Sequence, residues 1–128
     1  MGFARNRRTK GGPVDHELPV LVIKNLDGDV RAVYVSYACH CTTLSHNKVS
    51  GDWAGYAQEQ IQRSHPGAIA LVSVGCGADA NPSRGGGISD ETAAQHGQEI
   101  GLEVDRLVRH QLNGALRPIS GELDTRFS

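Results

Sequence analysis

The stretch AVYVSYACHCTTL, residues 32–44, joins a strand pattern to a histidine that lies between two cysteines. Its first four residues are apolar and favour β-structure, so they predict a buried strand. His40 falls just beyond the carboxyl end of that strand, where open α/β sheets form their binding sites. Because imidazole binds metal ions and transfers protons near neutral pH, His40 is a candidate for chemistry. The residues leave an alternative open, a core histidine beside two small buried thiols.

Two further apolar runs predict strands beside this one. Residues 19–26 are rich in β-branched side chains, and the turn sequence Asp-Gly-Asp at 27–29 separates them from a strand at 30–37. These two strands form a predicted hairpin. Residues 68–74 are a compact apolar run, which is typical of a central buried strand. The sheet is therefore assembled from runs that are spread along the chain.

Two stretches carry helical spacing. Residues 53–64 place apolar side chains on one face, with Asp52 as a helix cap, and residues 90–112 carry a longer apolar stripe. Residues 118–127 alternate weakly and predict a last strand, whereas residues 1–17 predict an irregular approach segment. The predicted fold class is α/β, a mixed β-sheet with helices packed against it in the order β-β-α-β-α-β.

Composition excludes several classes of function. The chain has 128 residues, enough for one modest domain, and its formal net charge of −1 indicates no nucleic-acid partner. No apolar run approaches the roughly 20 residues that span a bilayer, so we expect no transmembrane segment. Three cysteines are an odd number, which argues against a disulfide framework. A zinc site formed by Cys39, Cys41 and Cys76 is an alternative, but their spacing matches no common zinc module.

Five short motifs share an order with a known family. They are NRR at 6–8, GPVDH at 12–16, YACHxTTL at 37–44, GDxxGYA at 51–57 and GxGxDxNP at 75–82. In this order and spacing, the chain resembles the catalytic domain of the neutral/alkaline (non-lysosomal) ceramidases, and more closely their uncharacterised bacterial relatives. The resemblance runs over most of the chain, from Phe3 to Phe127.

The resemblance implies a zinc-dependent amide hydrolase. In such enzymes two histidines, a glutamate and a tyrosine, spread along a much longer chain, hold the zinc. His40 matches one of these histidines, and the other three ligands have no counterpart in this sequence. Residues 1–128 are therefore expected to be a single partial catalytic domain whose parent supplies the missing flanking segments. A parent that carries a signal peptide would be secreted or periplasmic.

The resemblance also implies roles for three other residues. Where ceramidases carry the serine implicated in amide cleavage, this chain has Asn81, which is no hydroxyl nucleophile but can donate a hydrogen bond to an oxyanion. Asp79 either hydrogen-bonds backbone amides in its own loop or holds His40 in orientation. Arg7 matches the family's Asn-Arg motif and would bind a polar group of the substrate.

Two functions remain in competition. The first is part of a zinc-dependent hydrolase of a ceramide-like lipid amide, or of another amide or ester, with the side chains of His40, Asp79 and Asn81 converging at the strand ends. The second is a non-catalytic or degenerate α/β domain without a complete metal site. Because catalytic zinc usually has three protein ligands, we expect the isolated chain to bind zinc weakly or not at all. A nucleotide or anion site at Gly85–Gly87 is disfavoured, because the lysine of the P-loop pattern is missing.

Overall fold

A tight turn joins the first two strands into a hairpin. The computed structural model describes residues 11–82 and 88–110. Strand β1 (Val20–Lys24) pairs antiparallel with β2 (Val30–Tyr37). Gly28 has a φ of +92°, which glycine adopts without steric cost, and Asn25 Oδ1 accepts a hydrogen bond of 2.7 Å from the Asp29 backbone N–H. The turn therefore satisfies its own polar groups and leaves the β-branched residues free to pair.

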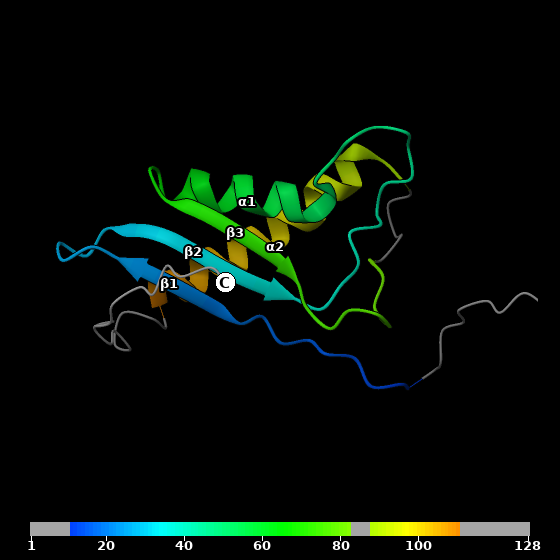
Figure 1. Cartoon of the computed structure of the whole chain (residues 1–128), viewed down its shortest axis with the longest axis horizontal. Coiled ribbons are helices and arrows are strands. Elements are labelled where there is room, and N and C mark those ends of the chain that lie inside the picture. Colours follow the sequence, from blue (N-terminus) through cyan, green and yellow to red (C-terminus); the bar gives the residue numbers. More distant parts are fainter. Residues whose placement is uncertain (1–10, 83–87, 111–128) are drawn as a thin grey trace, which may run out of the picture.

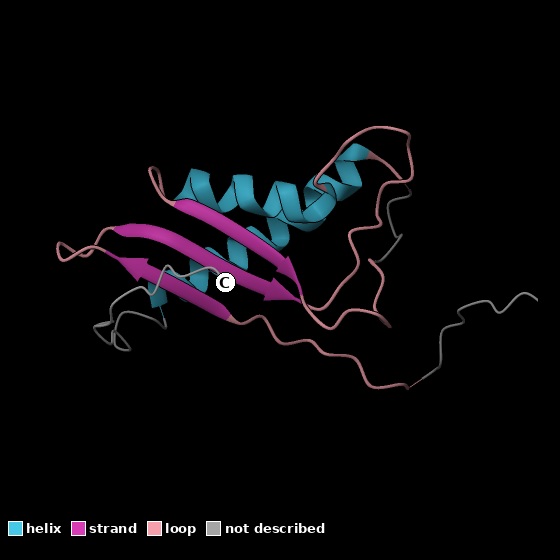
Figure 2. Ribbon diagram, viewed as in Figure 1, coloured by secondary structure: helices cyan, strands magenta, loops and turns pink. Residues whose placement is uncertain are grey.

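A helical crossover makes the sheet mixed. Helix α1 (Asp52–Ser64) follows β2 and leads into strand β3 (Ile69–Val74), which pairs parallel with β2. The strand order is β1-β2-β3, so β2 lies at the centre (Figures 1 and 2). Because β2 and β3 run in the same direction, the loops that follow them leave the sheet at the same edge.

Both helices cover one face of the sheet. Helix α2 (Asp90–His110) passes behind the strands in Figure 1 and packs against α1. Alternate residues of the strands meet both helices, as expected for a half-buried sheet. The main core consists of Val33, Val35, Ile61, Ala70, Val104 and Val108. Alternate side chains on the opposite face of the sheet remain exposed.

The predicted fold class is confirmed as α/β with a mixed sheet and packed helices, but the predicted order is corrected. The described residues follow the order β-β-α-β-α. The last strand, predicted at 118–127, lies outside the described residues, and α2 is described to His110. In the part of the approach segment that the structure describes, 11–17, there is no helix or strand. Neither described helix is both long and apolar enough to cross a membrane.

Candidate strand-end site

The loops that follow β2 and β3 run side by side. The backbone N–H of His40 donates to the carbonyl of Ala80 at 3.0 Å, and that of Gly75 donates to the carbonyl of Tyr37 at 2.9 Å. The approach is close enough to require glycine, since a Cβ at Gly77 would lie 2.6 Å from the backbone nitrogen of Cys39. The two motifs that carry the predicted site residues are thus neighbours in space.

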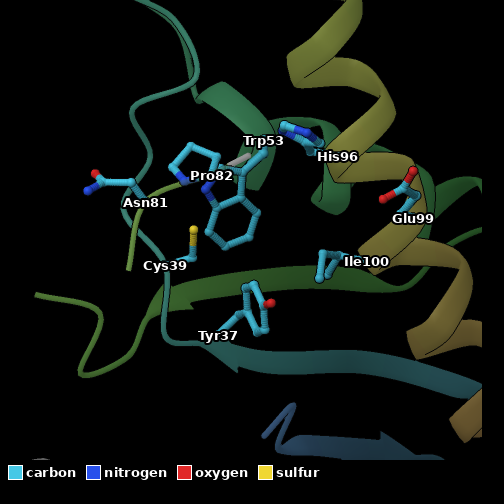
Figure 3. Close-up of a pocket in the computed structure, with 8 residues that line it drawn as sticks. All are labelled: Tyr37, Cys39, Trp53, Asn81, Pro82, His96, Glu99 and Ile100. Carbon is cyan, nitrogen blue, oxygen red and sulfur yellow. The ribbon is translucent and has the colours of Figure 1, made fainter. Parts of the chain in front are cut away.

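Asn81 is held by the first of these loops. The hydroxyl of Thr42 donates to Asn81 Oδ1 at 3.3 Å. An asparagine whose oxygen accepts in this way keeps its Nδ2 amide as a donor of two hydrogen bonds. Asn81 is exposed, and Figure 3 shows its side chain directed away from the apolar centre of the neighbouring pocket.

His40 is half-buried and positioned through its backbone. Its carbonyl accepts a hydrogen bond of 3.0 Å from the indole Nε1 of Trp53. Within the described residues, the structure records no hydrogen bond to the imidazole of His40 or to the carboxylate of Asp79, which is exposed. The strand ends therefore meet, while the roles predicted for His40, Asp79 and Asn81 remain predictions. Arg7 lies outside the described residues.

Asp52 holds the loop between β2 and α1 in place. Its φ is +52°, and its buried carboxylate accepts hydrogen bonds from the backbone N–H groups of Leu44 at 2.8 Å and Trp53 at 2.7 Å. The predicted cap is therefore corrected, because Gly51 occupies the N-cap position and Asp52 is the first residue of α1. The carboxylate still satisfies an orphan N–H of the first helical turn, and it also fixes the loop before the helix.

Two further contacts hold the same loop to α2. His46 Nε2 lies 3.2 Å from Asp90 Oδ1, and the hydroxyl of Thr43 lies 3.5 Å from His96 Nδ1. His46 and His96 thus both touch this junction. Three elements meet here, namely the loop after β2, the start of α1 and the start of α2.

A pocket of about 240 Å³ opens beside the strand ends. Tyr37 and Trp53 form its aromatic part, with ring centroids 5.8 Å apart and planes at 90°, the edge-to-face arrangement that aromatic pairs prefer. Figure 3 shows the Cys39 sulfur directed toward this part. The lining includes Asn81 but neither His40 nor Asp79. Its residues are Tyr37, Cys39, Trp53, Asn81, Pro82, His96, Glu99 and Ile100.

The sequence did not reveal this pocket, because its members come from four separate segments of the chain. Trp53 and Ile100 each lie on an apolar helix face, a pattern that predicts core packing equally well. Glu99 lies on the exposed side of the α2 pattern. The one signal in the sequence was the isolated tryptophan directly after the Gly-Asp motif at 51–52.

Cys39 and Cys41 are poor candidates for nucleophiles. Burial raises the pKa of the Cys39 thiol, with the nearby Cys41 and Asp52 adding to the rise, and burial also raises the pKa of Cys41. A thiol attacks as the thiolate, so both thiols stay protonated and weakly nucleophilic at neutral pH. Cys76 is exposed. Among the described residues, no three His, Cys, Asp or Glu side chains cluster to hold a metal, which leaves the three-cysteine site unsupported.

Comparison with solved structures finds this architecture within a larger protein. The chain matches part of the neutral ceramidase from Pseudomonas aeruginosa with a TM-score of 0.62 and 20% sequence identity. The fold resembles part of a neutral ceramidase. The match covers 85% of this chain and 19% of that one, so this chain spans about a fifth of the ceramidase. No protein-family model and no curated protein matches the sequence. The likeness suggested by the motifs is thus confirmed for the fold.

Proposed function

We propose that this chain is part of a hydrolase that cleaves an amide or ester, and that its strand-end loops form part of the substrate site. The observation that carries the proposal is the likeness of fold to neutral ceramidase over 85% of the chain. Two of the five motifs that resemble the ceramidases, at 37–44 and 75–82, lie in the two loops that meet at the strand ends. Fold and motifs therefore both support the strand-end loops as part of the substrate site.

Asn81 would stabilise the oxyanion of the reaction. Its Oδ1 accepts from Thr42, so its Nδ2 is the group left to donate to a developing negative charge. Arg7 would bind a polar group of the substrate, and Asp79 would hold His40 or the substrate in orientation. Asn81 cannot supply a hydroxyl nucleophile, so the attacking group must come from elsewhere in the enzyme.

Zinc does not fit the described residues as a complete site. His40 is the one candidate ligand that both its strand-end position and the family resemblance favour, and no three-ligand cluster lies in the described part of the chain. We assign His40 the role of a single ligand, whose partners would come from polypeptide beyond the described residues. A zinc ion held in this way would polarise a carbonyl or activate water.

The substrate would be a ceramide-like lipid amide. The pocket beside Asn81 is lined with Trp53, Tyr37 and Ile100, which offer an apolar surface to an acyl chain. Asn81 lies at the border of this pocket, so a substrate carbonyl bound at its amide would lie beside the apolar lining.

The alternative is a non-catalytic α/β domain that keeps the scaffold of the enzyme. Two observations favour it, the asparagine at position 81 and the single candidate metal ligand among the described residues. In this case the pocket would bind an apolar ligand without cleaving it.

An assay of the complete gene product separates these proposals. Hydrolysis of a fluorescent N-acylsphingosine, a short N-acyl amine and a short-chain ester would be measured with zinc and with a chelator. The hydrolase proposal predicts cleavage of the lipid amide that the chelator abolishes. In the same assay, Asn81→Ala should lower kcat by about 10²-fold, as loss of an oxyanion donor does. Asn47→Ala, in the exposed loop, should have no effect. Absence of hydrolysis on all three substrates with zinc present would favour the non-catalytic domain.

A further inference from the structure

Trp53 connects the buried core to the strand-end loops through one polar atom. Its side chain is 2% exposed, and its Nε1–H donates a hydrogen bond of 3.0 Å to the carbonyl of His40. A buried indole N–H usually finds an acceptor, and here the acceptor is the backbone of a candidate site residue. The Cys39 thiol lies 3.7 Å from the same carbonyl, but a thiol is a weak donor, so the indole is the main partner.

Two hydrogen bonds to the His40 backbone fix the direction in which its side chain leaves the chain. The N–H of His40 donates to the carbonyl of Ala80 at 3.0 Å, and the carbonyl of His40 accepts from Trp53. Because peptide groups are planar, these bonds hold the planes on both sides of the His40 Cα. Among the described residues the structure records no hydrogen bond to the imidazole, so the backbone is what places the ring.

Three elements hold the indole in turn. Its ring packs edge-to-face against Tyr37 at the end of β2, with centroids 5.8 Å apart (Figure 3). The backbone N–H of Trp53 donates to the buried carboxylate of Asp52 at the start of α1. Helix α2 comes so close to the Trp53 carbonyl that a Cβ at Gly97 would lie 2.5 Å from its oxygen. The donor is therefore rigid, as a group that positions a site must be.

The loop that Trp53 holds carries a second group of the site. Thr42 lies two residues beyond His40, and its hydroxyl donates to Asn81 Oδ1. We propose that Trp53 is a positioning residue of the strand-end site. Its indole N–H sets the place of His40 and, through Thr42, the direction of the Asn81 amide. This inference rests on the proposed hydrolase function, to which it adds one buried donor on α1 that supports both strand-end groups.

A replacement that removes only the N–H tests this role. In the complete gene product, Trp53 would be replaced by 3-benzothienylalanine, which has the same bicyclic shape but carries sulfur in place of the N–H. The apolar wall of the pocket is kept, so KM should stay unchanged. For a substrate that the wild type cleaves, kcat should fall by about tenfold or more, because small misplacements of reacting groups slow the chemical step. Amide hydrogen exchange at residues 40–44 should become faster.

Gln58→Met is the matched control. Gln58 Nε2 donates to the carbonyl of Ala70 at 3.1 Å, so this variant also removes a hydrogen bond from an α1 side chain to a backbone carbonyl, but near the start of β3. It should lower stability by a similar amount, while kcat and the exchange at residues 40–44 stay unchanged. If circular dichroism shows that the benzothienylalanine variant is unfolded, Trp53→Phe, which also lacks the N–H, should show the same fall in kcat.

The outcomes separate this inference from the proposed function. An unchanged kcat in a folded variant without the indole N–H overturns the inference, and so does an equal loss of kcat in Gln58→Met, since either result leaves Trp53 a purely structural residue. A fall in kcat without faster exchange at residues 40–44 overturns it as well. A wild type that cleaves none of the three substrates overturns the proposed function, and this inference with it.

Discussion

At the scale of single residues, Asp52 determines where the loop before α1 lies. It adopts a left-handed conformation, which costs a residue with a side chain about 1–2 kcal/mol. Its buried carboxylate offsets this cost by accepting two backbone N–H groups, from Leu44 and Trp53. Asparagine and aspartate tolerate this backbone region best, because their side chains hydrogen-bond locally.

Two replacements of Asp52 should therefore distinguish how much its carboxylate and how much its backbone conformation contribute to the free energy of unfolding. Asp52→Ala leaves the partly buried Leu44 amide and the buried Trp53 amide without their acceptor, and we expect a loss of about 3 kcal/mol in the free energy of unfolding. Asp52→Asn keeps one acceptor and the tolerance for positive φ, so it should cost about 1 kcal/mol. Urea unfolding measures both. Equal stability of Asp52→Ala and the wild type would show that the carboxylate is not an anchor.

At this scale the sequence predicts that the two strand ends lie together, but it does not predict how the side chains there are arranged. The β-branched run before His40 and the Gly-rich loop at 75–82 predict two strand ends at one edge of the sheet. The hydrogen bond from the His40 backbone N–H to the Ala80 carbonyl lies at this edge. The cap predicted at Asp52 was wrong, because the left-handed conformation of this residue depends on a loop fixed by tertiary contacts. The sequence also gave no sign of the hydrogen bond from the Trp53 indole to the His40 carbonyl.

At the scale of elements, the contact between α1 and α2 depends on glycine. A Cβ at Gly97 would lie 2.5 Å from the carbonyl oxygen of Trp53 and 2.7 Å from the backbone nitrogen of Ala57. Backbone atoms cannot yield as flexible side chains do, so the absence of a side chain at 97 lets the helices approach closely. The apolar stripe of α2 predicted a buried face that includes Gly97, but not which helix it would meet.

Two glycine substitutions with opposite expected effects on stability test this contact. Gly97→Ala should destabilise the fold by about 1 to 3 kcal/mol, because the added methyl overpacks the helix interface. Gly55→Ala, in α1, is the control, since a Cβ there meets nothing within 4 Å. It should stabilise the fold by about 0.5–1 kcal/mol through helix propensity. Thermal and urea unfolding measure both, and a neutral Gly97→Ala would contradict the close packing.

The elements themselves were largely predictable, since each rests on a strong local pattern. Strand β3 was predicted at 68–74 and lies at Ile69–Val74, and α1 was predicted at 53–64 and lies at Asp52–Ser64. Local periodicity sets such bounds, whereas pocket lining depends on how distant segments pack.

At the scale of the whole molecule, His65 makes stability depend on pH. Its side chain is 11% exposed, and its Nε2 lies 3.1 Å from Asp105 Oδ1, without hydrogen-bond alignment to any described residue. Burial lowers the pKa of His65, Asp105 opposes this, and Arg109 and Lys24 lower the pKa further. The folded protein therefore binds this proton less readily than the unfolded chain, where the histidine pKa is about 6.5.

The consequence is a loss of stability in acid. His65 contributes fully above the unfolded pKa, and its contribution falls as the pH drops through that value toward the folded pKa. His65→Gln should therefore flatten the decline in the free energy of unfolding between neutral pH and about pH 5. His110→Gln, an exposed histidine at the end of α2, should leave the decline unchanged. A wild type that gains stability relative to His65→Gln on acidification would refute the predicted sign.

The proposed activity would require the complete gene product and not the described residues alone. The fold matches about a fifth of a neutral ceramidase, and no three His, Cys, Asp or Glu side chains of the described residues cluster to hold a metal. The isolated chain should therefore bind zinc weakly or not at all, whereas the complete gene product should bind it tightly.

Substitution of His40 in the complete gene product tests this claim most directly. Zinc affinity and hydrolysis of a fluorescent N-acylsphingosine would be measured for the wild type, for His40→Ala and for His16→Ala, an exposed histidine outside the strand ends. We predict that His40→Ala lowers zinc affinity and hydrolysis together by about 10²-fold or more, as loss of a ligand from a catalytic zinc site does, while His16→Ala matches the wild type. Full zinc binding and full hydrolysis in His40→Ala would contradict the account.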